Sequence, residues 1–462
     1  MRAILCIRDM VNCAWKVHGP RFVAPTILIC MFAGYPAASG AADMPAARAS
    51  APGSVNGVSK ARKPERELQV LHWLTSASER KATDSIAAKL ADENIEWRDA
   101  AIPGGAGVGA GKVLKSRVLA GTAPEVTQLV GVSIGEWADL GLLLELNDVA
   151  SAGAWNKQLY PTIWSLVQHR GHVVAAPLGI HRINTLFYNR KLFNKLGIAP
   201  PKTWEEFEQV AEKLKQAGII PLAQSSEAWQ VATLFETLVL AESGPAYYRE
   251  LFVQKTPGAY ADARLTHALK HLRQLKEWMP MPLTERRWTE VARQFSDGDA
   301  AMFIMGDWVK GELNAWGQET DDNFSCIAVP GTADYHLYSV DTLAMLMQDY
   351  SHQHAQEKLA QIVMSPAAQD DYNQFKGSIS VRRAADTSRM DSCSRDSAQI
   401  FARGAAVQAP SLVHRMATDE ATKDAIIGEV HNYFVNDAIS AADAQHRLGA
   451  IIRSLSKRGK GT

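Results

Sequence analysis

Residues 188–223 read Y-N-R-K-L-F-N-K-L-G-I-A-P-P-K-T-W-E-E-F-E-Q-V-A-E-K-L-K-Q-A-G-I-I-P-L-A, and this stretch decides the fold. Pro200 and Pro201 cannot continue a helix, because proline lacks the backbone N–H that a helix needs. Thr203 is a good N-cap, and Glu206, three residues later, completes a capping box. The pattern therefore predicts a helix that begins at Thr203.

The apolar residues of this helix recur at steps of three and four, at Trp204, Phe207, Val210, Ala211 and Leu214. That spacing places them on one face, which packs against another layer of the protein. Gly218 can adopt the left-handed conformation that ends a helix, and the apolar residues 219–223 fit a short strand. The stretch is therefore an α/β unit whose helix packs on a sheet.

Length and charge restrict the class of protein. A chain of 462 residues with 47% hydrophobic residues can bury two cores, so two or three domains are expected. The 49 Lys and Arg residues balance the 49 Asp and Glu residues. We find no long basic run with interleaved aromatic residues, so a nucleic-acid partner is not expected. A neutral ligand fits the composition better.

The N-terminus has the order of a secretory signal. Basic residues at positions 2, 8, 16 and 21 precede a mostly apolar stretch from Phe22 to Ala33, and small residues follow at 37–42. The apolar stretch is short for a membrane anchor, which needs about twenty apolar residues. We expect residues 1–42 to be a signal peptide, 43–67 a flexible leader and 457–462 a tail, and the protein to be periplasmic.

Two cysteines, Cys326 and Cys393, remain after the signal is removed. In an oxidising compartment such a pair is a disulfide candidate, and we predict that the two residues are bridged. The alternative is two separate buried thiols.

Three short motifs suggest other chemistry. Residues 104–112 resemble a phosphate loop, but Ala106 stands where the pattern needs its first glycine and Val113 stands where it needs Ser or Thr. His267 and His271 lie one helical turn apart without a third ligand, so no metal or other cofactor is predicted. The sequence G-V-S-I-G around Ser133 matches a nucleophile elbow, but no His-Gly-Gly segment supplies an oxyanion loop. A serine hydrolase is therefore the weaker alternative.

Several polar and aromatic residues follow predicted strands. Trp73 lies at the end of the strand at 68–74 and Glu79 follows it, while Trp308 follows the strand at 300–305. Ligands of open α/β sheets bind beyond the carboxyl ends of strands, so these residues are candidates for binding. Each also has a structural alternative: the indoles can be core residues, and Glu79 can complement the helix dipole. Asp341 is a ligand contact or a strand-edge charge, and Trp229 can face ligand or core.

Five motifs extend the pattern over the chain: H-W-L-T-S-A-S-E from His72, V-L-K-S-R-V from Val113, M-G-D-W-V-K-G-E from Met305, Y-S-V-D from Tyr338 and H-R-M-A from His414. With the unit at 188–223, they resemble the glucose- and mannose-type branch of the extracellular solute-binding proteins of carbohydrate ABC importers. The resemblance covers residues 68 to about 456.

The resemblance implies a two-lobed periplasmic-binding-protein-like α/β fold of type II. Each lobe would be a mainly parallel sheet flanked by helices, with about three crossovers and a ligand cleft between the lobes. We assign residues 68–180 and 289–335 to lobe 1, and residues 181–288 and 336–456 to lobe 2. A monomer is expected.

By the same resemblance, Trp73 and Trp308 would stack on a pyranose, and Glu79, Asp341 and His414 would hydrogen-bond its hydroxyls. Trp229 and Lys310 complete the implied site. Two positions depart from the family pattern: Leu74 replaces a usual tryptophan and Val130 a usual lysine. The Q-S-S-E segment at 224–227 also stands where H-G-G-Q is usual. We therefore expect a changed or less polar glycoside as ligand.

The function expected from the resemblance is that of the substrate-binding component of an ABC sugar importer. Without catalysis, it would capture a mono- or small oligosaccharide, glucose- or mannose-like, by lobe closure and deliver it to membrane permease subunits. Alternatives are a sugar receptor that signals without import, a two-lobed scaffold that binds nothing, and the secreted hydrolase that uses Ser133.

Overall fold

The computed structural model describes residues 66–347 and 350–458. The expected signal peptide, the leader up to residue 65 and residues 459–462 of the tail lie outside the described residues. None of the helices described is long and apolar enough to span a membrane.

The first lobe is built on a six-stranded sheet in the order β12-β11-β3-β1-β2, with β6 also paired to β11. β1 is parallel to β2 and β3, whereas β11 is antiparallel to β3 and β6. β11 therefore occupies the centre of the sheet. The strands are β1 (Arg66–His72), β2 (Ile95–Ala101), β3 (Val126–Leu129), β6 (Ala176–Arg182), β11 (His336–Met345) and β12 (Gln408–Pro410).

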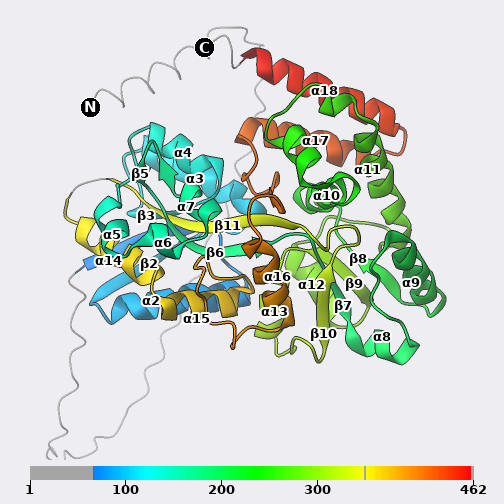
Figure 1. Cartoon of the computed structure of the whole chain (residues 1–462), viewed down its shortest axis with the longest axis horizontal. Helices are drawn as coiled ribbons and strands as arrows, with labels where there is room; N and C mark the ends of the chain where they lie inside the picture. Colours follow the sequence, from blue (N-terminus) through cyan, green and yellow to red (C-terminus); the bar gives the residue numbers. More distant parts are fainter. Residues whose placement is uncertain (1–65, 348–349, 459–462) are drawn as a thin grey trace, which may run out of the picture. The chain divides into compact units, whose positions relative to one another are not determined.

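The second lobe is built on a four-stranded sheet in the order β10-β7-β9-β8 (Figure 1). β7 is antiparallel to both of its neighbours, and only β8 and β9 are parallel. The two-lobed α/β fold is as expected, but the sheets are mixed instead of mainly parallel. The strands are β7 (Thr185–Asn189), β8 (Ile220–Ala223), β9 (Ala300–Met305) and β10 (Phe324–Ala328).

Helices cover both sheets, and each lobe has its own hydrophobic core. The first core takes residues from α2 (Ala77–Ala91), α3 (Val108–Leu119), α4 (Val132–Asp139), α5 (Asn147–Ala152), α6 (Trp155–Gln158), α7 (Pro161–Leu166), α14 (Gln353–Val363) and α15 (Pro366–Lys376). The second takes residues from α8 (Arg190–Leu196), α9 (Trp204–Gln216), α10 (Ala228–Phe252), α11 (Ala263–Gln274), α12 (Trp288–Ser296), α13 (Trp308–Ala315), α17 (Glu420–Val435) and α18 (Ala441–Arg458). Small elements are β4 (Gln168–His169), β5 (His172–Val173), η1 (Gly105–Gly107), η2 (Ala259–Ala261) and η3 (Leu275–Trp278).

The division of the chain between the lobes differs from the expected one. Residues 289–335, expected in lobe 1, contain β9 and β10, which pair in the sheet of the second lobe. Residues 338–402, expected in lobe 2, contain most of β11 and the helices α14 and α15, which build the first core. The physical reason is strand pairing: the main-chain hydrogen bonds of β11 go to β3 and β6.

The unit at 188–223 forms as its sequence predicts. Thr203 caps α9, its hydroxyl accepts the amide of Glu206 at 3.2 Å, and the capping box is present. Phe207 and Leu214 are buried, and Gly218 has φ of 75° just beyond the helix. α9 packs on the sheet strand β8, so the local prediction is confirmed.

Three chain segments connect the lobes: residues 183–184, 329–335 and 411–418. Asn184, which is fully buried, links the first two of them. Its amide nitrogen donates to Thr332 Oγ1 at 2.9 Å and to the carbonyl of Tyr335 at 3.0 Å, and its oxygen accepts the amide of Leu337 at 2.9 Å. These bonds hold the crossovers side by side.

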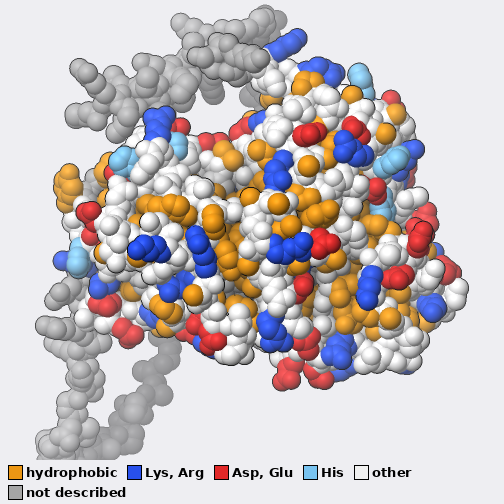
Figure 2. Space-filling view, viewed as in Figure 1, with side chains coloured by type: hydrophobic (Ala, Val, Ile, Leu, Met, Phe, Trp, Pro, Cys, Tyr) orange, Lys and Arg blue, Asp and Glu red, His pale blue; other side chains and the backbone are white. Residues whose placement is uncertain are grey.

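Charges of both signs are interspersed over the surface. On the face in Figure 2, Lys and Arg side chains alternate with Asp and Glu side chains over both lobes. This distribution accords with the balanced charge of the chain.

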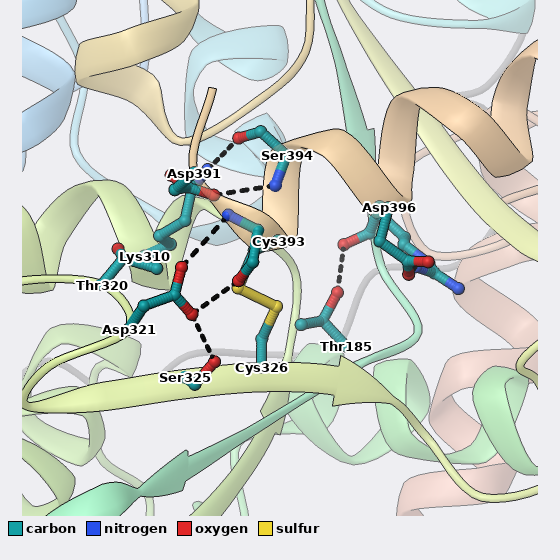
Figure 3. The surroundings of a disulfide bond; sticks show 12 residues. Thr185, Lys310, Thr320, Asp321, Ser325, Cys326, Asp391, Cys393, Ser394 and Asp396 are labelled. Carbon is teal, nitrogen blue, oxygen red and sulfur yellow. Dashed lines mark hydrogen bonds and ion pairs between the residues drawn. A yellow bond between two sulfur atoms is a disulfide. The ribbon is translucent and has the colours of Figure 1, made fainter. Parts of the chain in front are cut away.

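The structure joins Cys326 to Cys393 by a disulfide, with the Cα atoms 5.8 Å apart (Figure 3). Cys326 lies on β10, and Cys393 lies on α16 (Ser392–Ala402), which contacts β10 and β11. Asp321 supports the same junction, because its carboxylate accepts hydrogen bonds from the hydroxyls of Ser325 at 2.8 Å and Ser392 at 2.6 Å. The disulfide thus fastens α16 to the second lobe.

Candidate functional site

A cavity of about 240 Å³ lies between the lobes. The first lobe lines it with residues near its strand ends, the first turn of α2 and the end of α15: Trp73, Thr75, Ser76, Glu79, Pro103, Gly104, Gly105, Ala106, Val130, His181, Ser339, Asp341 and Lys376. The second lobe contributes Glu227, Trp229, Arg287, Trp288, Thr289 and Trp308, and the third crossover contributes His414.

Seven of the nine expected ligand-binding residues line this cavity, namely Trp73, Glu79, Val130, Trp229, Trp308, Asp341 and His414. They come from segments separated by up to about three quarters of the chain. Their convergence is a property of the fold and not of any one motif.

Leu74 and Lys310 do not line the cavity, so the structure corrects these two expectations. Leu74 is 3% exposed and belongs to the core of the first lobe, because successive side chains point to opposite sides of an extended backbone. Lys310 Nζ forms an ion pair with Asp391 at 2.8 Å and hydrogen-bonds to Ser394 (Figure 3). It therefore braces α13 against α16.

Glu79 is oriented by three donors from its own lobe. Its Oε2 accepts the backbone amides of Thr75 at 2.9 Å and Ser76 at 3.0 Å, and its Oε1 lies 3.2 Å from Lys376 Nζ. Burial alone would lower the pKa of Lys376, but Glu79 and Asp341 raise it above its usual value. A carboxylate has about four acceptor sites, so Glu79 keeps one for a ligand hydroxyl.

Asp341 is held in the same way on β11. Gln128 Nε2 donates to its Oδ1 at 3.0 Å, while His181 Nε2 at 3.1 Å and the Tyr372 hydroxyl at 3.0 Å contact its Oδ2. Burial opposes the charge, but His181, with Lys376 and the Tyr372 hydroxyl, outweighs burial and keeps the pKa of Asp341 well below its usual value. Asp341 is therefore an ionised acceptor with one site free for a ligand.

His181 connects carboxylates of both lobes. Its Nδ1 lies 2.5 Å from Asp307 Oδ1 of the second lobe, and its Nε2 faces Asp341 of the first. Burial would lower the pKa of His181, but the two carboxylates raise it. Asp307 stands at the N-cap position of α13 but makes no side-chain capping bond; its carboxylate lies against His181 and accepts the amide of Arg182.

A second contact between the lobes lies beside the cavity. Glu312 of α13 is 2% exposed, and its carboxylate accepts the amides of Ala77 at 3.2 Å and Ser78 at 2.9 Å. These amides open α2 in the first lobe, where unpaired N–H groups attract negative charge. Glu312 therefore holds the two lobes together.

Aromatic rings from both lobes gather at the cavity. The ring of Trp308 lies 5.5 Å from His181, 5.2 Å from His414 and 6.5 Å from Trp229, centroid to centroid. Trp73 faces the cavity from the first lobe and is partly exposed. These rings provide flat apolar surfaces beside the charged acceptors.

The backbone of the glycine-containing segment 104–107, in the first lobe, lies close to the rings of Trp229 and Trp73. A Cβ atom on Gly105 would lie 2.4 Å from Trp229 Nε1, and one on Gly107 would lie 2.7 Å from the Trp73 ring. Gly107 also has φ of 69°, a conformation that suits glycine. The segment lines the cavity, a role that its failed phosphate-loop pattern did not suggest.

Ser133 is not arranged as a nucleophile. Its hydroxyl donates to the carbonyl of Val130 at 2.6 Å and lies 3.3 Å from the amide of Val130. A serine nucleophile needs a base within hydrogen-bonding distance, and the partners found for Ser133 among the described residues are these two backbone atoms. Among all the residues that the structure describes, no group of three or more His, Cys, Asp or Glu is placed to hold a metal ion.

Several lining residues were not predicted from the sequence, among them His181, Lys376, Trp288, Arg287 and Glu227. His181 lies near the end of β6, just before the first crossover, and this position before a lobe boundary could have marked it. Lys376 ends a helix and carries no local signal, because only the tertiary fold brings it to Glu79.

A family model described as "Bacterial extracellular solute-binding protein" matches residues 76–370. A "Probable sugar-binding periplasmic protein" of Brucella suis is 31% identical over 394 residues, which cover 84% of this chain and 93% of that protein. A protein of the same name in Rhizobium meliloti is 30% identical over 398 residues, covering 85% and 95%.

Solved structures share the fold at low sequence identity. A bacterial solute receptor with a preference for β-D-galactopyranose has a TM-score of 0.74 and 16% identity, covering 84% of this chain and 99% of its own. Maltose-bound MalE3 of T. maritima has a TM-score of 0.70 and 16% identity, covering 84% and 100%. These neighbours confirm the two-lobed fold of type II.

Proposed function

Because the chain belongs to the family of bacterial extracellular solute-binding proteins, we propose that it is the periplasmic sugar-binding component of an ABC importer. It captures a mono- or small oligosaccharide, glucose- or mannose-like, between its lobes and delivers it to membrane permease subunits. The names of its relatives in Brucella suis and Rhizobium meliloti support the sugar and the periplasm. It performs no chemical reaction on the ligand.

The observation that carries the proposal is the composition of the interlobe cavity. Indoles of both lobes line it together with two carboxylates whose orientation is fixed by protein donors. A sugar presents apolar C–H faces that suit indole rings, and hydroxyl groups that donate to carboxylates. We assign stacking to Trp73 and Trp308, with Trp229 nearby, and hydroxyl binding to Glu79, Asp341 and His414.

The size of the cavity favours a small ligand. Its volume of about 240 Å³ falls below the roughly 300–1,000 Å³ of pockets for drug-sized molecules. A monosaccharide fits this volume better than a longer chain does. Val130, 3% exposed at the position where the resemblance implies a lysine, offers no charge to a hydroxyl, which favours a less polar glycoside.

Lobe closure explains how such a site selects its ligand. Both lobes must contact the sugar, so an epimer with a misplaced hydroxyl leaves buried polar groups unpaired. Such a ligand binds the closed state less tightly and shifts the population toward it less. The permease would therefore receive the closed, loaded form.

Titration of the chain without residues 1–42 with a panel of mono- and disaccharides tests the proposal. We expect at least one sugar to give a saturable change in tryptophan fluorescence and a binding isotherm by calorimetry. Trp308→Ala should weaken calorimetric affinity about thirty-fold or more, because a central tryptophan is worth about 2 kcal/mol or more. Trp316→Ala, at the far end of α13, is the control and should keep the affinity. Absence of binding across the panel would refute the proposal.

A further inference from the structure

A buried chain of hydrogen bonds leads from the core of the second lobe to the cavity. Glu236 on α10 and Ser411 in the third crossover are both fully buried. Ser411 Oγ lies 2.7 Å from Glu236 Oε1 and 3.0 Å from His414 Nδ1. His414 lines the cavity, so the chain connects a carboxylate that never meets the ligand with an imidazole that faces it.

The direction of each bond follows from the donors available. Glu236 Oε2 accepts the Leu412 amide at 2.6 Å and the Tyr248 hydroxyl at 2.7 Å. When Glu236 is ionised, Oε1 is an acceptor too, so the hydroxyl hydrogen of Ser411 must point at it. Two lone pairs 2.7 Å apart without a hydrogen between them would repel each other.

Ser411 Oγ is then left with acceptor sites only. The backbone amide of His414 donates to it at 3.2 Å. His414 Nδ1 must also be a donor, since the one hydrogen of the hydroxyl is already used. In a neutral imidazole one nitrogen carries the proton and the other accepts, so Nε2 carries a free lone pair.

We propose that Glu236, acting through Ser411, fixes His414 in the tautomer protonated at Nδ1, so that His414 presents a hydrogen-bond acceptor to the ligand at Nε2. Glu236 is thus a positioning residue for specificity, remote from the ligand. The inference concerns the proposed sugar site and rests on the proposed function for its consequence in binding. The inference implies that a hydroxyl group of the ligand donates a hydrogen bond to Nε2 of His414.

Two features of the surroundings support this assignment. Burial, with the nearby charges of His181, Lys423 and Lys376, lowers the pKa of His414 to about 3, although Asp341 acts to raise it. The ring is therefore neutral. Burial raises the pKa of Glu236 to about 7, while the bonds from Tyr248, Ser411 and the Leu412 amide oppose that rise. The carboxylate form therefore prevails in mildly alkaline solution.

The same geometry predicts that the hydrogen bonds from Glu236 through Ser411 to His414 reverse their direction when Glu236 is protonated. Oε2 faces two donors, so a proton on Glu236 must sit on Oε1 and donate to Ser411 Oγ. The Ser411 hydrogen then turns to His414 Nδ1, and the ring carries its proton on Nε2. Glu236→Gln should lock this reversed state, because its amide oxygen must face the Leu412 and Tyr248 donors and its NH₂ group must face Ser411.

Nitrogen NMR of the sugar-free protein with ¹⁵N-labelled histidine tests the inference at about pH 9, roughly two units above the pKa of Glu236. His414→Gln identifies the signals of His414 by their loss. We expect wild-type His414 to show a protonated Nδ1 and an unprotonated Nε2, and Glu236→Gln to exchange these shifts. A protonated Nε2 in the wild type, or unchanged shifts in Glu236→Gln, would overturn the proposal.

Two further variants separate the relay from general effects on folding. Tyr248→Phe removes a donor to Oε2 but leaves Oε1 and Ser411 in place, so the tautomer should persist. Ser411→Ala breaks the relay itself, so both tautomers should appear, and this variant serves if Glu236→Gln does not fold. A single unchanged tautomer in Ser411→Ala would contradict the role of Glu236.

Binding of D-glucose and its monodeoxy-fluoro derivatives reads out the consequence. Fluorine cannot donate, so the derivative fluorinated at the hydroxyl that faces His414 should bind wild type about ten-fold or more weaker than glucose. Glu236→Gln should reduce this difference, and an equal difference in both proteins would count against the inference. If no sugar binds the wild type, the proposed function fails, whereas the NMR result still decides the tautomer.

Discussion

At the scale of single residues, the burial of Glu236 couples the stability of the fold to pH. Its pKa is raised from the ordinary 4.5 to about 7, because burial disfavours the charged form. When the pH lies between these two pKa values, Glu236 keeps its proton in the folded chain but has lost it in the unfolded chain. This contribution to stability is therefore complete below pH 4.5 and is lost as the pH rises through about 7.

Glu236→Gln should remove this pH dependence. At about 1.4 kcal/mol per pKa unit, the wild type should gain up to about 3 kcal/mol of unfolding free energy over the variant as the pH falls from about 7 to 4.5. Urea unfolding of both proteins across that interval measures the difference. Parallel pH profiles would show that Glu236 does not titrate there.

Single residues also show where the sequence stops being informative. Trp73 and Leu74 are neighbours, yet the first lines the cavity and the second is core. The motif M-G-D-W-V-K-G-E contains both Trp308, which lines the cavity, and Lys310, which does not. The partners of Lys310, Asp391 and Ser394, lie some eighty residues away in the sequence. A motif locates a segment at the site, but side-chain direction and distant partners decide which members reach it.

At the scale of elements, the segment around η1 must come close to Trp229 for the cavity to close. Gly105→Val should push this segment away, because a Cβ there would already lie 2.4 Å from the indole. We expect sugar affinity to fall about ten-fold, as overpacking costs about 1–3 kcal/mol. Calorimetry with the best sugar of the panel measures it.

Gly109→Ala is the matched control for this change. A Cβ on Gly109 would meet its nearest atoms at 3.5 Å, an ordinary contact. Its affinity should equal that of the wild type. An equal loss of sugar affinity in both variants would mean that any substitution in this region weakens binding by destabilising the lobe.

The disulfide gives a second prediction for elements. It closes a loop between residues 67 positions apart, for which the chain-entropy model gives about 4 kcal/mol. Reduction, or Cys326→Ser with Cys393→Ser, should lower the unfolding free energy by roughly that amount in urea. The chain without residues 1–42, denatured and unreduced, should contain no free thiol, and two free thiols would exclude the bridge.

Elements with local signals are predictable from sequence, whereas their partners are not. The capping box of Thr203 and Glu206 specifies the start of α9 within a few residues. β11, in contrast, is a strand whose sheet is chosen by β3, some two hundred residues earlier. Pairing across such distances leaves no local pattern, which is why the lobe assignments of residues 289–335 and 338–402 were wrong.

At the scale of the whole molecule, Glu312 favours the closed arrangement of the lobes. If the lobes part to admit a ligand, the carboxylate of Glu312 would leave the α2 amides, so closure would gain two hydrogen bonds to a charged group. Glu312→Gln weakens them, and a charged hydrogen bond is worth about 1.5–3 kcal/mol. Sugar affinity should fall about ten- to hundred-fold, since binding and closure are coupled.

Small-angle X-ray scattering with and without sugar should show that Glu312→Gln closes only at higher sugar concentration. Glu319→Gln is the control, because Glu319 is exposed beyond the end of α13. It should close at the same concentration as the wild type. Equal behaviour of the two variants would remove Glu312 from closure.

The interleaving of the two lobes along the chain has a consequence for biosynthesis. The central strand of the first sheet, β11, begins at His336, and the second core needs α17 and α18 near the C-terminus. A growing polypeptide therefore cannot finish either half until most of it has been made. We expect the unfinished chain to lack a completed core in either lobe, which is the unfolded state that export through a narrow membrane channel requires.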